Sequence, residues 1–218
     1  AEVFQGYFQG LSYLSKHKAI FILAIQKASL MLAVSGFNDV LQVELSSKIF
    51  VIGEGGSTSL GWLYAIVGVG TGLSPIIARW LTGDRERALR VAIAVGYGIT
   101  LVGLMIMYPI HSLGMMMTGA FFRGFGIAMI WVFSTTLLLK KLPNKVRGRV
   151  LGTEFALLTL AGAIGSGLGG WFLDAFNFSL QNLILLMGFL MLSFGINWFI
   201  NGVWRADKLA IQSPVSID

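Results

Sequence analysis

The chain alternates between long apolar stretches and short polar connections. A helix that crosses a bilayer needs roughly 20 mostly apolar residues, and six stretches are long enough. They cover residues 20–45, 60–79, 90–109, 112–139, 150–173 and 182–203. Glycine, proline and charged residues gather between them, which is typical of turns. The pattern predicts an all-α membrane protein whose residues 19–204 form a bundle of six transmembrane helices.

The two ends of the chain follow a different pattern. In residues 1–18, apolar side chains recur at helical spacing with Gln, Ser and Lys between them. This segment is interpreted either as an interfacial helix on the membrane surface or as a linker. Residues 205–218 are expected to form a cytoplasmic tail. Because the sequence begins at Ala1 and not at a methionine, we expect a fragment of a longer chain.

Composition supports the membrane class and argues against catalysis. The 218 residues are 56% hydrophobic and only 12% charged, against about 25% charged in soluble domains. There is no cysteine, no pair of histidines at metal-ligand spacing and no glycine-rich phosphate loop. We therefore predict no enzyme, no cofactor and no metal site, and any transport would depend on an ion gradient.

Positive charge lies mainly on one side of the predicted bundle. Thirteen of the 16 lysines and arginines flank or join the spans on the side that holds both termini. The connections on the other side contain only Lys48. Such asymmetry predicts that both termini lie in the cytoplasm of a plasma (inner) membrane protein. A nucleic-acid partner would instead require one basic patch with stacking aromatics, so none is expected.

Charged residues inside the spans fall in the first and the fourth. Span one contains Lys27, Asp39 and Glu44, and span four contains Arg123. A charge in the bilayer core costs at least about 2.5–3.5 kcal/mol, so it should face the bundle interior or a watery cavity. Six spans divide into two inverted three-helix repeats, a common plan of secondary transporters. Spans one and four are then counterparts and the candidates to line a cavity.

Span one also carries a polar stripe. Residues at steps of three or four share one face of an α-helix. The stripe comprises Lys27, Met31, Ser35, Asp39 and Gln42, with Asn38 beside it. Two interpretations stay open: a water-filled pathway for substrate or ion, and hydrogen bonding between helices by Asn38 and Gln42.

Depth in the membrane suggests a partner for the arginine. At 1.5 Å per residue, Asp39 lies roughly 9 Å below the outer end of span one. Arg123 lies roughly 16 Å below the start of span four, within reach of a long side chain. We hypothesise that Arg123 pairs with Asp39 across the cavity or binds an anionic substrate group. The alternative is a structural arginine that donates to backbone carbonyls.

Three segments resemble the major facilitator superfamily. GTGLSPIIARWLTGDRERALR is similar to the degenerate second copy of its loop motif, and Asp84 and Arg85 match the Asp-Arg of that motif. Trp80 stands where the motif usually has Gly, and Arg87 and Ala88 replace its later Gly-Arg. FFRGFGIAMIW resembles the Arg-then-Gly signature of the fourth helix. VRGRVLGTEFALLTLAGAIGSGLGGWFLD resembles the loop and eleventh helix of bacterial efflux-type members.

The resemblance implies the C-terminal half, spans seven to twelve, of a twelve-helix transporter whose N-terminal half belongs to the same chain. It also implies that the first helix of each triple lines the central cavity and that the loop motif helps to lock a cytoplasmic gate. Glu154 would receive an arginine from the other half or be an ordinary helix-end carboxylate beside Arg147 or Arg149. The residues expected at the gate are Asp84, Arg85, Arg87, Arg90 and Glu154.

The favoured function is therefore a secondary active transporter, coupled to protons or another ion, that exports a small molecule by alternating access. Lys27, Ser35, Asn38, Asp39, Gln42 and Arg123 are the residues expected along the substrate or ion pathway. A rival from another class is a six-helix scaffold or assembly subunit that binds a partner protein. A third reading is a six-helix pore, which predicts passive flux.

Overall fold

Helices make up all the regular structure that is described. The computed structural model describes Phe21 and residues 26–144 and 146–204, and within these ranges there is no strand. The predicted surface segment 1–18 and the predicted tail 205–218 lie outside the described residues. Residues 26–30 are helical and lead into the first named element. The elements are η1 (Met31–Gly36), α3 (Phe37–Glu44), η2 (Leu45–Ile49), η3 (Glu54–Gly56), α4 (Ser57–Thr82), α5 (Glu86–Met107), α6 (Leu113–Lys141), α7 (Arg147–Ala175), α8 (Leu180–Trp198) and η4 (Phe199–Trp204).

The helix ends follow the polar connections of the sequence. Ser112 and Ser179 precede α6 and α8, and each side-chain oxygen accepts a hydrogen bond from the backbone N–H three residues later, at 3.2 Å and 3.1 Å. Such capping satisfies one of the backbone donors that a helix start leaves unpaired. Gly83, with φ of 58°, ends α4 in a conformation that suits glycine.

Five helices of the described part are long and apolar enough to cross a membrane. They correspond to predicted spans two to six, and their ends agree with the prediction to within a few residues. Only part of span one is described, and η1 and η2 within it are π-helical. A π-helical turn contains more residues than an α-helical turn and often occurs at functional sites.

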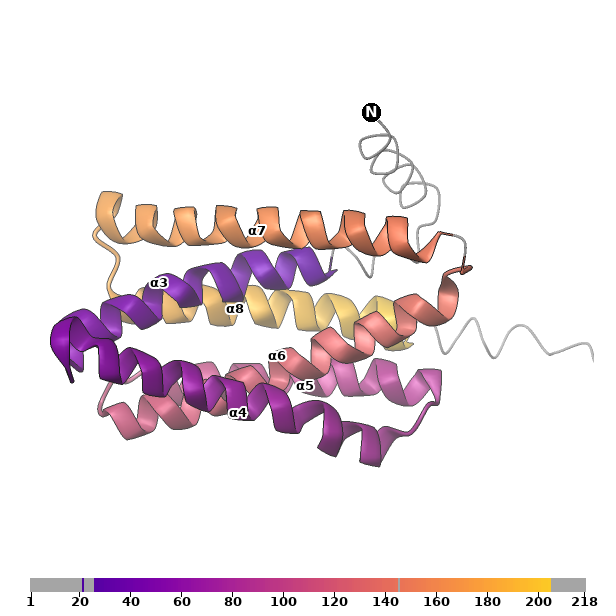
Figure 1. Ribbon diagram of the computed structural model, residues 1–218, viewed down its shortest axis with the longest axis horizontal. Coiled ribbons are helices and arrows are strands. Elements are labelled where there is room, and N and C mark those ends of the chain that lie inside the picture. Colours follow the sequence, from indigo (N-terminus) through magenta and orange to yellow (C-terminus); the bar gives the residue numbers. More distant parts are fainter. Residues whose placement is uncertain (1–20, 22–25, 145, 205–218) are drawn as a thin grey trace, which may run out of the picture.

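The helices form two groups that lie side by side (Figure 1). One group contains span one (η1 and α3), α7 and α8, and the other contains α4, α5 and α6. Span one packs mainly against α7, whereas α6 packs against both α4 and α5. The contact of α5 with α8 joins the two groups. Each triple of the sequence has thus exchanged its first helix with the other triple.

This exchange follows the symmetry of an inverted repeat. If span one is the counterpart of α6, α4 of α7 and α5 of α8, the span one–α7 contact maps onto the α6–α4 contact. The α5–α8 contact maps onto itself. Inverted three-helix repeats of this kind were expected from the placement of charge along the sequence.

Glycines allow the exchanged helices to approach closely. A Cβ on Gly36 of η1 would lie 2.6 Å from the backbone of Gly165 in α7. A Cβ on Gly103 of α5 would lie 2.5 Å from the backbone nitrogen of Arg123 in α6. Neither distance is compatible with a side chain, so backbone packing fixes both span one and the arginine-bearing segment of α6.

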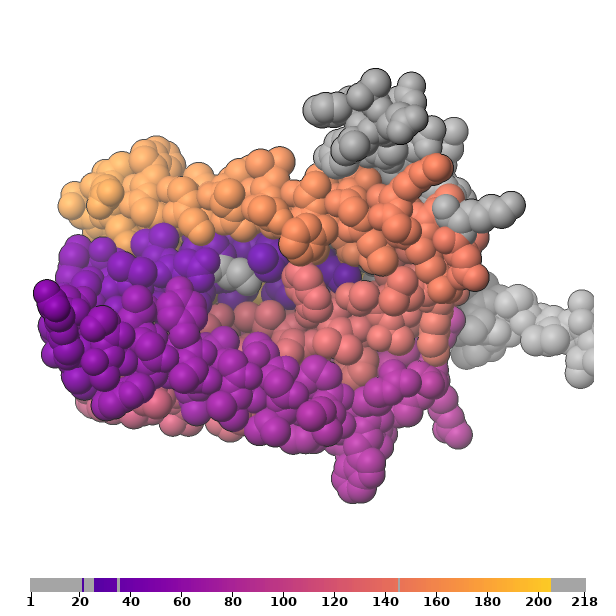
Figure 2. Space-filling view, in the orientation of Figure 1, coloured from indigo at the N-terminus to yellow at the C-terminus, as the bar shows by residue number. Residues whose placement is uncertain are grey.

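One face of the molecule is hollowed between α7 and α4, with α3 and α6 visible between them (Figure 2). The two helices at its edges are also the least covered, since only 17% of the apolar window of each is buried. The corresponding window of α6 is 56% buried. Large apolar side chains stay exposed on both edge helices, among them Trp62, Leu73 and Ile76 on α4 and Phe155, Leu160 and Trp171 on α7.

Candidate functional site

Lys27 lies in a buried cluster where span one, α6 and α7 meet. Its Nζ is 2.8 Å from Glu154 Oε1 on α7, and the two side chains are 1% and 4% exposed. The same Nζ donates to Thr135 Oγ1 on α6 at 2.7 Å. It also lies 5.4 Å from the ring centroid of Trp131. A buried ammonium needs such partners because desolvation would otherwise make its charge very costly.

This cluster links the two helix groups. Span one and α7 belong to the first group, whereas Thr135 and Trp131 belong to α6 of the second. The preceding residue also reaches the other group: Gln26 Nε2 donates to the hydroxyl of Tyr97 on α5 at 3.1 Å. Neighbouring side chains of span one therefore hold two helices of the other group.

The residues of the predicted polar stripe of span one differ in exposure. The predicted spacing assumes an unbroken α-helix, and the π-helical η1 interrupts that periodicity between Lys27 and Asp39. Asn38 and Gln42 are buried, whereas Asp39 is exposed. The side chain of Ser35 lies outside the described part of the structure.

The amides of this segment have unmet hydrogen bonds. Both side-chain polar atoms of Gln42, and Oδ1 of Asn38, are buried without a protein partner in the described part of the chain. An unmet buried polar group costs about 1–3 kcal/mol, so such atoms normally meet water or a ligand. The proposed hydrogen bonding between helices is not made by these atoms.

Arg123 is buried in α6 and poorly supplied with acceptors. The residue is 3% exposed, and its Nε and Nη2 donate to no acceptor among the described residues. Its backbone is held against Gly103 of α5 by the close approach described above. A guanidinium has five donors and does not lose its charge, so the site has capacity for an anion or for water.

Asp39 and Tyr64 provide the electrostatic surroundings of Arg123. Both lie close enough to act on its charge, and Asp39 is the stronger influence. Arg123 in turn acts on Asp39. Yet the described residues include no direct ion pair between the two, and both Nε and Nη2 of the arginine stay unbonded. Asp39 and Arg123 thus influence each other's charge, and the described residues show no direct ion pair between them.

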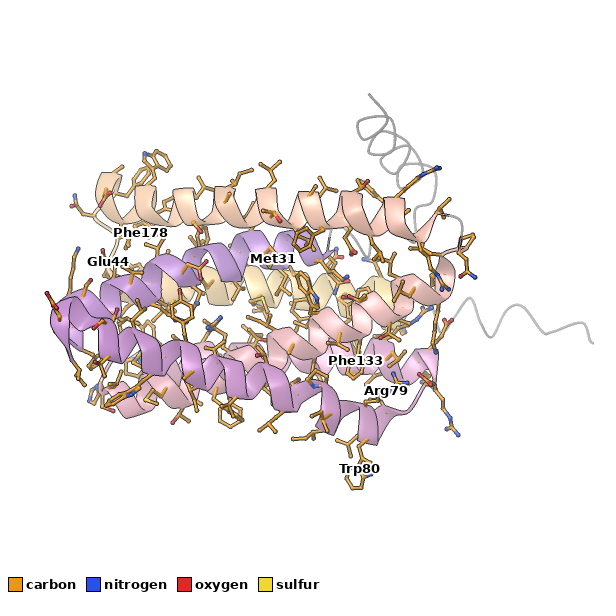
Figure 3. All side chains as sticks on the ribbon, viewed as in Figure 1. Met31, Glu44, Arg79, Trp80, Phe133 and Phe178 are labelled. Atoms are coloured by element: carbon orange, nitrogen blue, oxygen red, sulfur yellow. The ribbon has the colours of Figure 1, made fainter. Side chains whose placement is uncertain are left out.

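The α4–α5 turn collects the other expected site residues. Asp84 forms an ion pair with Arg79 at 2.9 Å, and Lys140 of α6 donates to its backbone carbonyl. Trp80, in the same turn region, is 86% exposed and points away from the bundle (Figure 3). Glu44 lies at the opposite end of the molecule from Arg79 (Figure 3).

Arg90 of α5 makes its contacts within the described bundle. It pairs with Glu86 at 3.2 Å and donates to the carbonyl of Gly202 in η4 at 3.3 Å. Trp198 donates its indole N–H to the carbonyl of Arg90. Of the five residues expected at the gate, Asp84 and Arg85 lie in the α4–α5 turn and Arg87 in the first turn of α5. Arg90 contacts η4, and Glu154 belongs to the Lys27 cluster.

Comparison with protein families identifies this arrangement. The family model described as Major Facilitator Superfamily matches residues 19–211. The chain belongs to the major facilitator superfamily. This confirms the resemblance to the superfamily, which was drawn from the loop and helix motifs. Comparison with curated proteins and with solved structures gave no match.

Members of this superfamily are membrane transporters that bind small-molecule substrates. The chain is therefore a multi-pass membrane protein of a transporter family. Within its described residues, no group of three or more His, Cys, Asp or Glu side chains has the arrangement of a metal site.

For this superfamily member, sequence reasoning placed Lys27 and Glu154 in separate sites, and the structure joins them. One signal was available: Lys27 lies seven residues and Glu154 four residues from the predicted cytoplasmic end of its helix, or roughly 10 Å and 6 Å deep. Opposite charges at similar depth are natural partners in a membrane. Tyr64 gave no such signal, because a tyrosine near a helix end is common in membrane proteins.

Proposed function

We propose that this chain is the C-terminal half of a secondary active transporter that exports a small molecule, coupled to protons or another ion, by alternating access. The partner of the chain is then the N-terminal half of the same protein, in the plasma membrane and with the ends of this segment in the cytoplasm. The observation that carries the proposal is the buried, incompletely bonded guanidinium of Arg123, whose charge Asp39 influences.

A purely structural arginine would have its donors satisfied by carbonyls. Arg123 instead keeps two buried donors unmet, and Gln42 and Asn38 keep unmet polar atoms in span one. Spans one and four are the two counterparts of the inverted repeat, and sites of such transporters lie at the repeat interface. The unmet groups therefore support a solvated pathway between these two helices.

The exposed apolar surface of the two edge helices supports the proposal that a second six-helix half packs against this one. The hollowed face is bordered by α4 and α7, which leave large apolar side chains and small residues unpacked. At Gly68 and Gly72 of α4, for example, an added Cβ atom would meet no other atom within 4 Å. A second six-helix half packed on this face would cover both edges and close the hollow into a cavity between the halves.

In this proposal the α4–α5 turn forms part of the cytoplasmic gate. The Asp84–Arg79 pair fixes the turn within this half, and Arg85 and Arg87 lie exposed beside it. Arg90 and Glu154 act within the half, by attaching α5 to η4 and span one to α7. The gate then opens and closes as the halves rock, with the Lys27 cluster moving as part of a rigid body.

Cysteine labelling tests alternating access without knowledge of the substrate. This chain contains no cysteine, so single cysteines in it report unambiguously once any in the rest of the protein are removed. Val43→Cys lies one turn beyond Asp39 on the outer side and is 47% exposed. Leu139→Cys lies one turn beyond Thr135 on the cytoplasmic side, where α6 faces Lys27. The whole protein is labelled in right-side-out and inverted vesicles with an impermeant maleimide.

Alternating access predicts reciprocal labelling. When a proton gradient is imposed, reaction at Val43→Cys and at Leu139→Cys should change in opposite directions, and Arg123→Gln should abolish the change. Simultaneous labelling of both positions from either side would indicate a pore. Labelling that never responds to a gradient of protons, sodium or potassium would support the scaffold instead.

A further inference from the structure

Span one contains two π-helical segments, one on each side of the α-helical segment α3. The segment η1 precedes α3, and η2 follows it. A π turn bonds residue i to residue i+5, so it contains one residue more than an α turn. Because of η1, each residue of α3 lies one place behind its position in an uninterrupted α-helix. One place corresponds to a rotation of about 100° about the helix axis, since an α-helix has about 3.6 residues per turn.

The observed orientation of α3 does not match its own amphipathic pattern. An amphipathic helix normally buries its apolar residues and exposes its polar residues. In α3, the polar Asn38 and Gln42 are buried with unmet hydrogen bonds among the described residues, whereas Val43 is 47% exposed. The burial of two amides beside an exposed valine indicates that another orientation of α3 would suit this sequence better.

Closing η1 into an α turn would correct this mismatch. The register of α3, meaning which residue occupies which place along it, would shift so that each residue takes the place of the next one. Asn38 would move to the exposed place of Asp39, and Gln42 to the exposed place of Val43. Leu41 would move to the buried place of Gln42. Both amides would then reach the open side of the helix, while Leu41 stays inside.

The hydroxyls of η2 keep carbonyls of α3 bonded during such a shift. Ser46 donates to the carbonyl of Gln42 at 2.8 Å, and Ser47 donates to the carbonyl of Val43 at 2.7 Å. A serine hydroxyl can bond the carbonyl one turn before it in place of a backbone N–H. The outer end of α3 can therefore change between α and π turns while these two carbonyls keep a partner.

Glycines form much of the contact between span one and α7. Gly162, Gly165 and Gly169 of α7 all lie toward span one. Small residues let helices pack closely by backbone contact, without long side chains that fit between those of the neighbour. The contact of Gly36 with the backbone of Gly165 belongs to the observed register. A small separation of the two helices would release it and allow α3 to turn.

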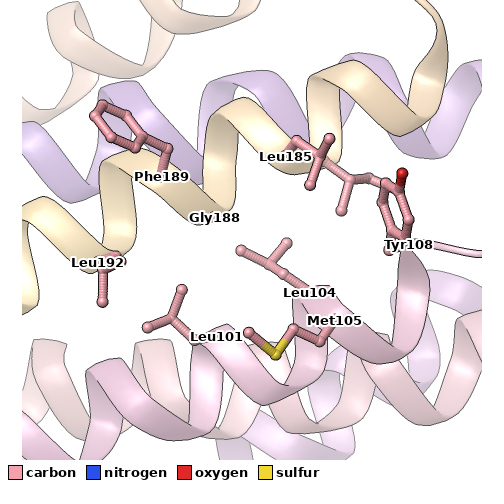
Figure 4. A pocket seen from close by; sticks show the side chains of 9 residues that line it. Leu101, Leu104, Met105, Tyr108, Leu185, Gly188, Phe189 and Leu192 are labelled. Atoms are coloured by element: carbon pink, nitrogen blue, oxygen red, sulfur yellow. The ribbon is translucent and has the colours of Figure 1, made fainter.

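Helix α8 provides a contrast, because it is also followed by a π-helical segment, η4. Large apolar side chains of α5 and α8, among them Leu104 and Phe189, line the groove of about 400 Å³ between these helices (Figure 4). The indole of Trp198 in α8 donates to the carbonyl of Arg90 in α5 at 3.0 Å. Large side chains and this hydrogen bond hold α8 in one register, whereas the glycine contacts of span one do not hold α3 in the same way.

We propose that span one has two registers, and that closing η1 replaces Asp39 by Asn38 at the pathway near Arg123. This proposal rests on the pathway between spans one and four described under the proposed function. In the observed register, Asp39 acts on the charge of Arg123. In the second register Asp39 occupies the place of Val40, against Gly169 of α7. An uncharged amide then lies in its former place, so the pathway gains positive charge and attracts an anion more strongly.

Cysteine labelling of the whole protein in detergent, without any gradient, tests the two registers. The chain contains no cysteine of its own, and any in the rest of the protein are removed. In the observed register, Val43→Cys should react with an impermeant maleimide and Gln42→Cys should not. Asp39→Asn removes the attraction to Arg123, so a register populated to a few per cent should become the main one. Labelling of Gln42→Cys should then rise about tenfold, and labelling of Val43→Cys should fall.

Two controls separate a change of register from other effects. Glu44→Gln also converts a carboxylate of α3 to an amide, but Glu44 pairs with the exposed Lys48, so neither labelling rate should change. Leu41→Cys occupies a buried place in both registers and should stay unlabelled. Labelling of Leu41→Cys in the Asp39→Asn background would indicate local unfolding of α3 and would overturn the proposal.

Deletion of Ala33 tests the role of η1 directly. It removes the additional residue of the π turn, so that α3 keeps its observed places through an ordinary α turn. Asp39→Asn should then leave the labelling of Gln42→Cys low, and a rise that persists would overturn the proposal. Rocking of the two halves would change labelling of Gln42→Cys and Val43→Cys in the same direction. Equal changes would therefore reject the two registers and leave the transporter proposal standing, whereas opposite changes without any gradient response in vesicles would do the reverse.

Discussion

Two buried cations in the same bundle have opposite surroundings. Lys27 has an ion-pair partner, a hydroxyl acceptor and an aromatic ring within reach. Arg123 has charges near it but two donors without an acceptor in the described structure. Lys27, whose hydrogen-bond partners are present, links helices from both groups. Arg123, which has unmet donors, lies on the proposed pathway. Hydrogen-bond satisfaction, more than charge itself, separates a structural ion from a binding group.

The largest change in stability is expected when Lys27 is left without its counter-ion. Glu154→Gln should destabilise the protein by about 3–5 kcal/mol, because an uncompensated charge stays buried. Thermal unfolding followed by tryptophan fluorescence in detergent measures the loss. Glu86→Gln, which breaks the exposed pair with Arg90, is the control and should cost at most about 0.5 kcal/mol.

The double variant Lys27→Met/Glu154→Leu distinguishes a charge effect from a packing effect. It removes both ions, so most of the stability lost in Glu154→Gln should return. A double variant as unstable as the single one would show that shape, and not charge pairing, dominates at this cluster.

A smaller effect is expected from the glycine contact that holds span one in place. Gly36→Ala should cost about 1–3 kcal/mol, because the new methyl group meets the backbone of α7. Gly167→Ala lies on α7 itself with nothing within 4 Å of its Cβ, so it serves as the control. Equal unfolding temperatures for the two variants would contradict the close packing of span one on α7.

Arg123→Gln should change stability by less than about 1 kcal/mol, since Nε and Nη2 donate to no acceptor among the described residues. The same variant should abolish the gradient-dependent labelling of Val43→Cys. Unfolding temperature and labelling are measured on one preparation. A large loss of stability with labelling intact would make Arg123 structural and Lys27 the better candidate for the pathway.

The smallest change in stability is expected at Lys48, which lies on the side of the bundle predicted to face away from both termini. Its pKa is raised by the hydrogen bond and the charge of Glu44, at 2.6 Å. Stabilisation from a raised lysine pKa is present at neutral pH and is lost as the pH rises through that value. The pair is exposed, so Lys48→Gln should leave the unfolding temperature unchanged at pH 7. A measurable drop there would mean that this pair is buried in the complete protein.

Much of the fold could be predicted from the sequence, because hydrophobic length and turn residues both carry the signal. The ends of α4 to α8 follow the apolar runs between Gly, Pro and charged residues. The exchange of the first helices could not be read from periodicity, since any apolar helix can pack on several neighbours. The π-helical η1 was also unpredicted, because MLAVSG contains nothing that distinguishes a π turn from an α turn.

The sequence allowed the ionised residues of the candidate site to be predicted, but not which of them contact one another. Lys27, Asp39 and Arg123 were identified because ionised groups are rare in membrane helices. The partner of Lys27 depends on which helix packs beside span one, and that is a property of the tertiary structure. That the described residues show no direct ion pair between Asp39 and Arg123 likewise depends on backbone positions set by Gly103 and by η1.

The exchange of first helices also imposes an order on biosynthesis. Glu154 follows Lys27 by 127 residues, so span one is made long before the helix that neutralises it. At about 5–20 residues per second, the ribosome takes roughly 6–25 s to supply that partner. During this interval the lysine must wait at the membrane surface, in the insertion machinery or beside helices already inserted. Span one therefore reaches its final position only as the fifth span is completed, and the half assembles as one cooperative unit.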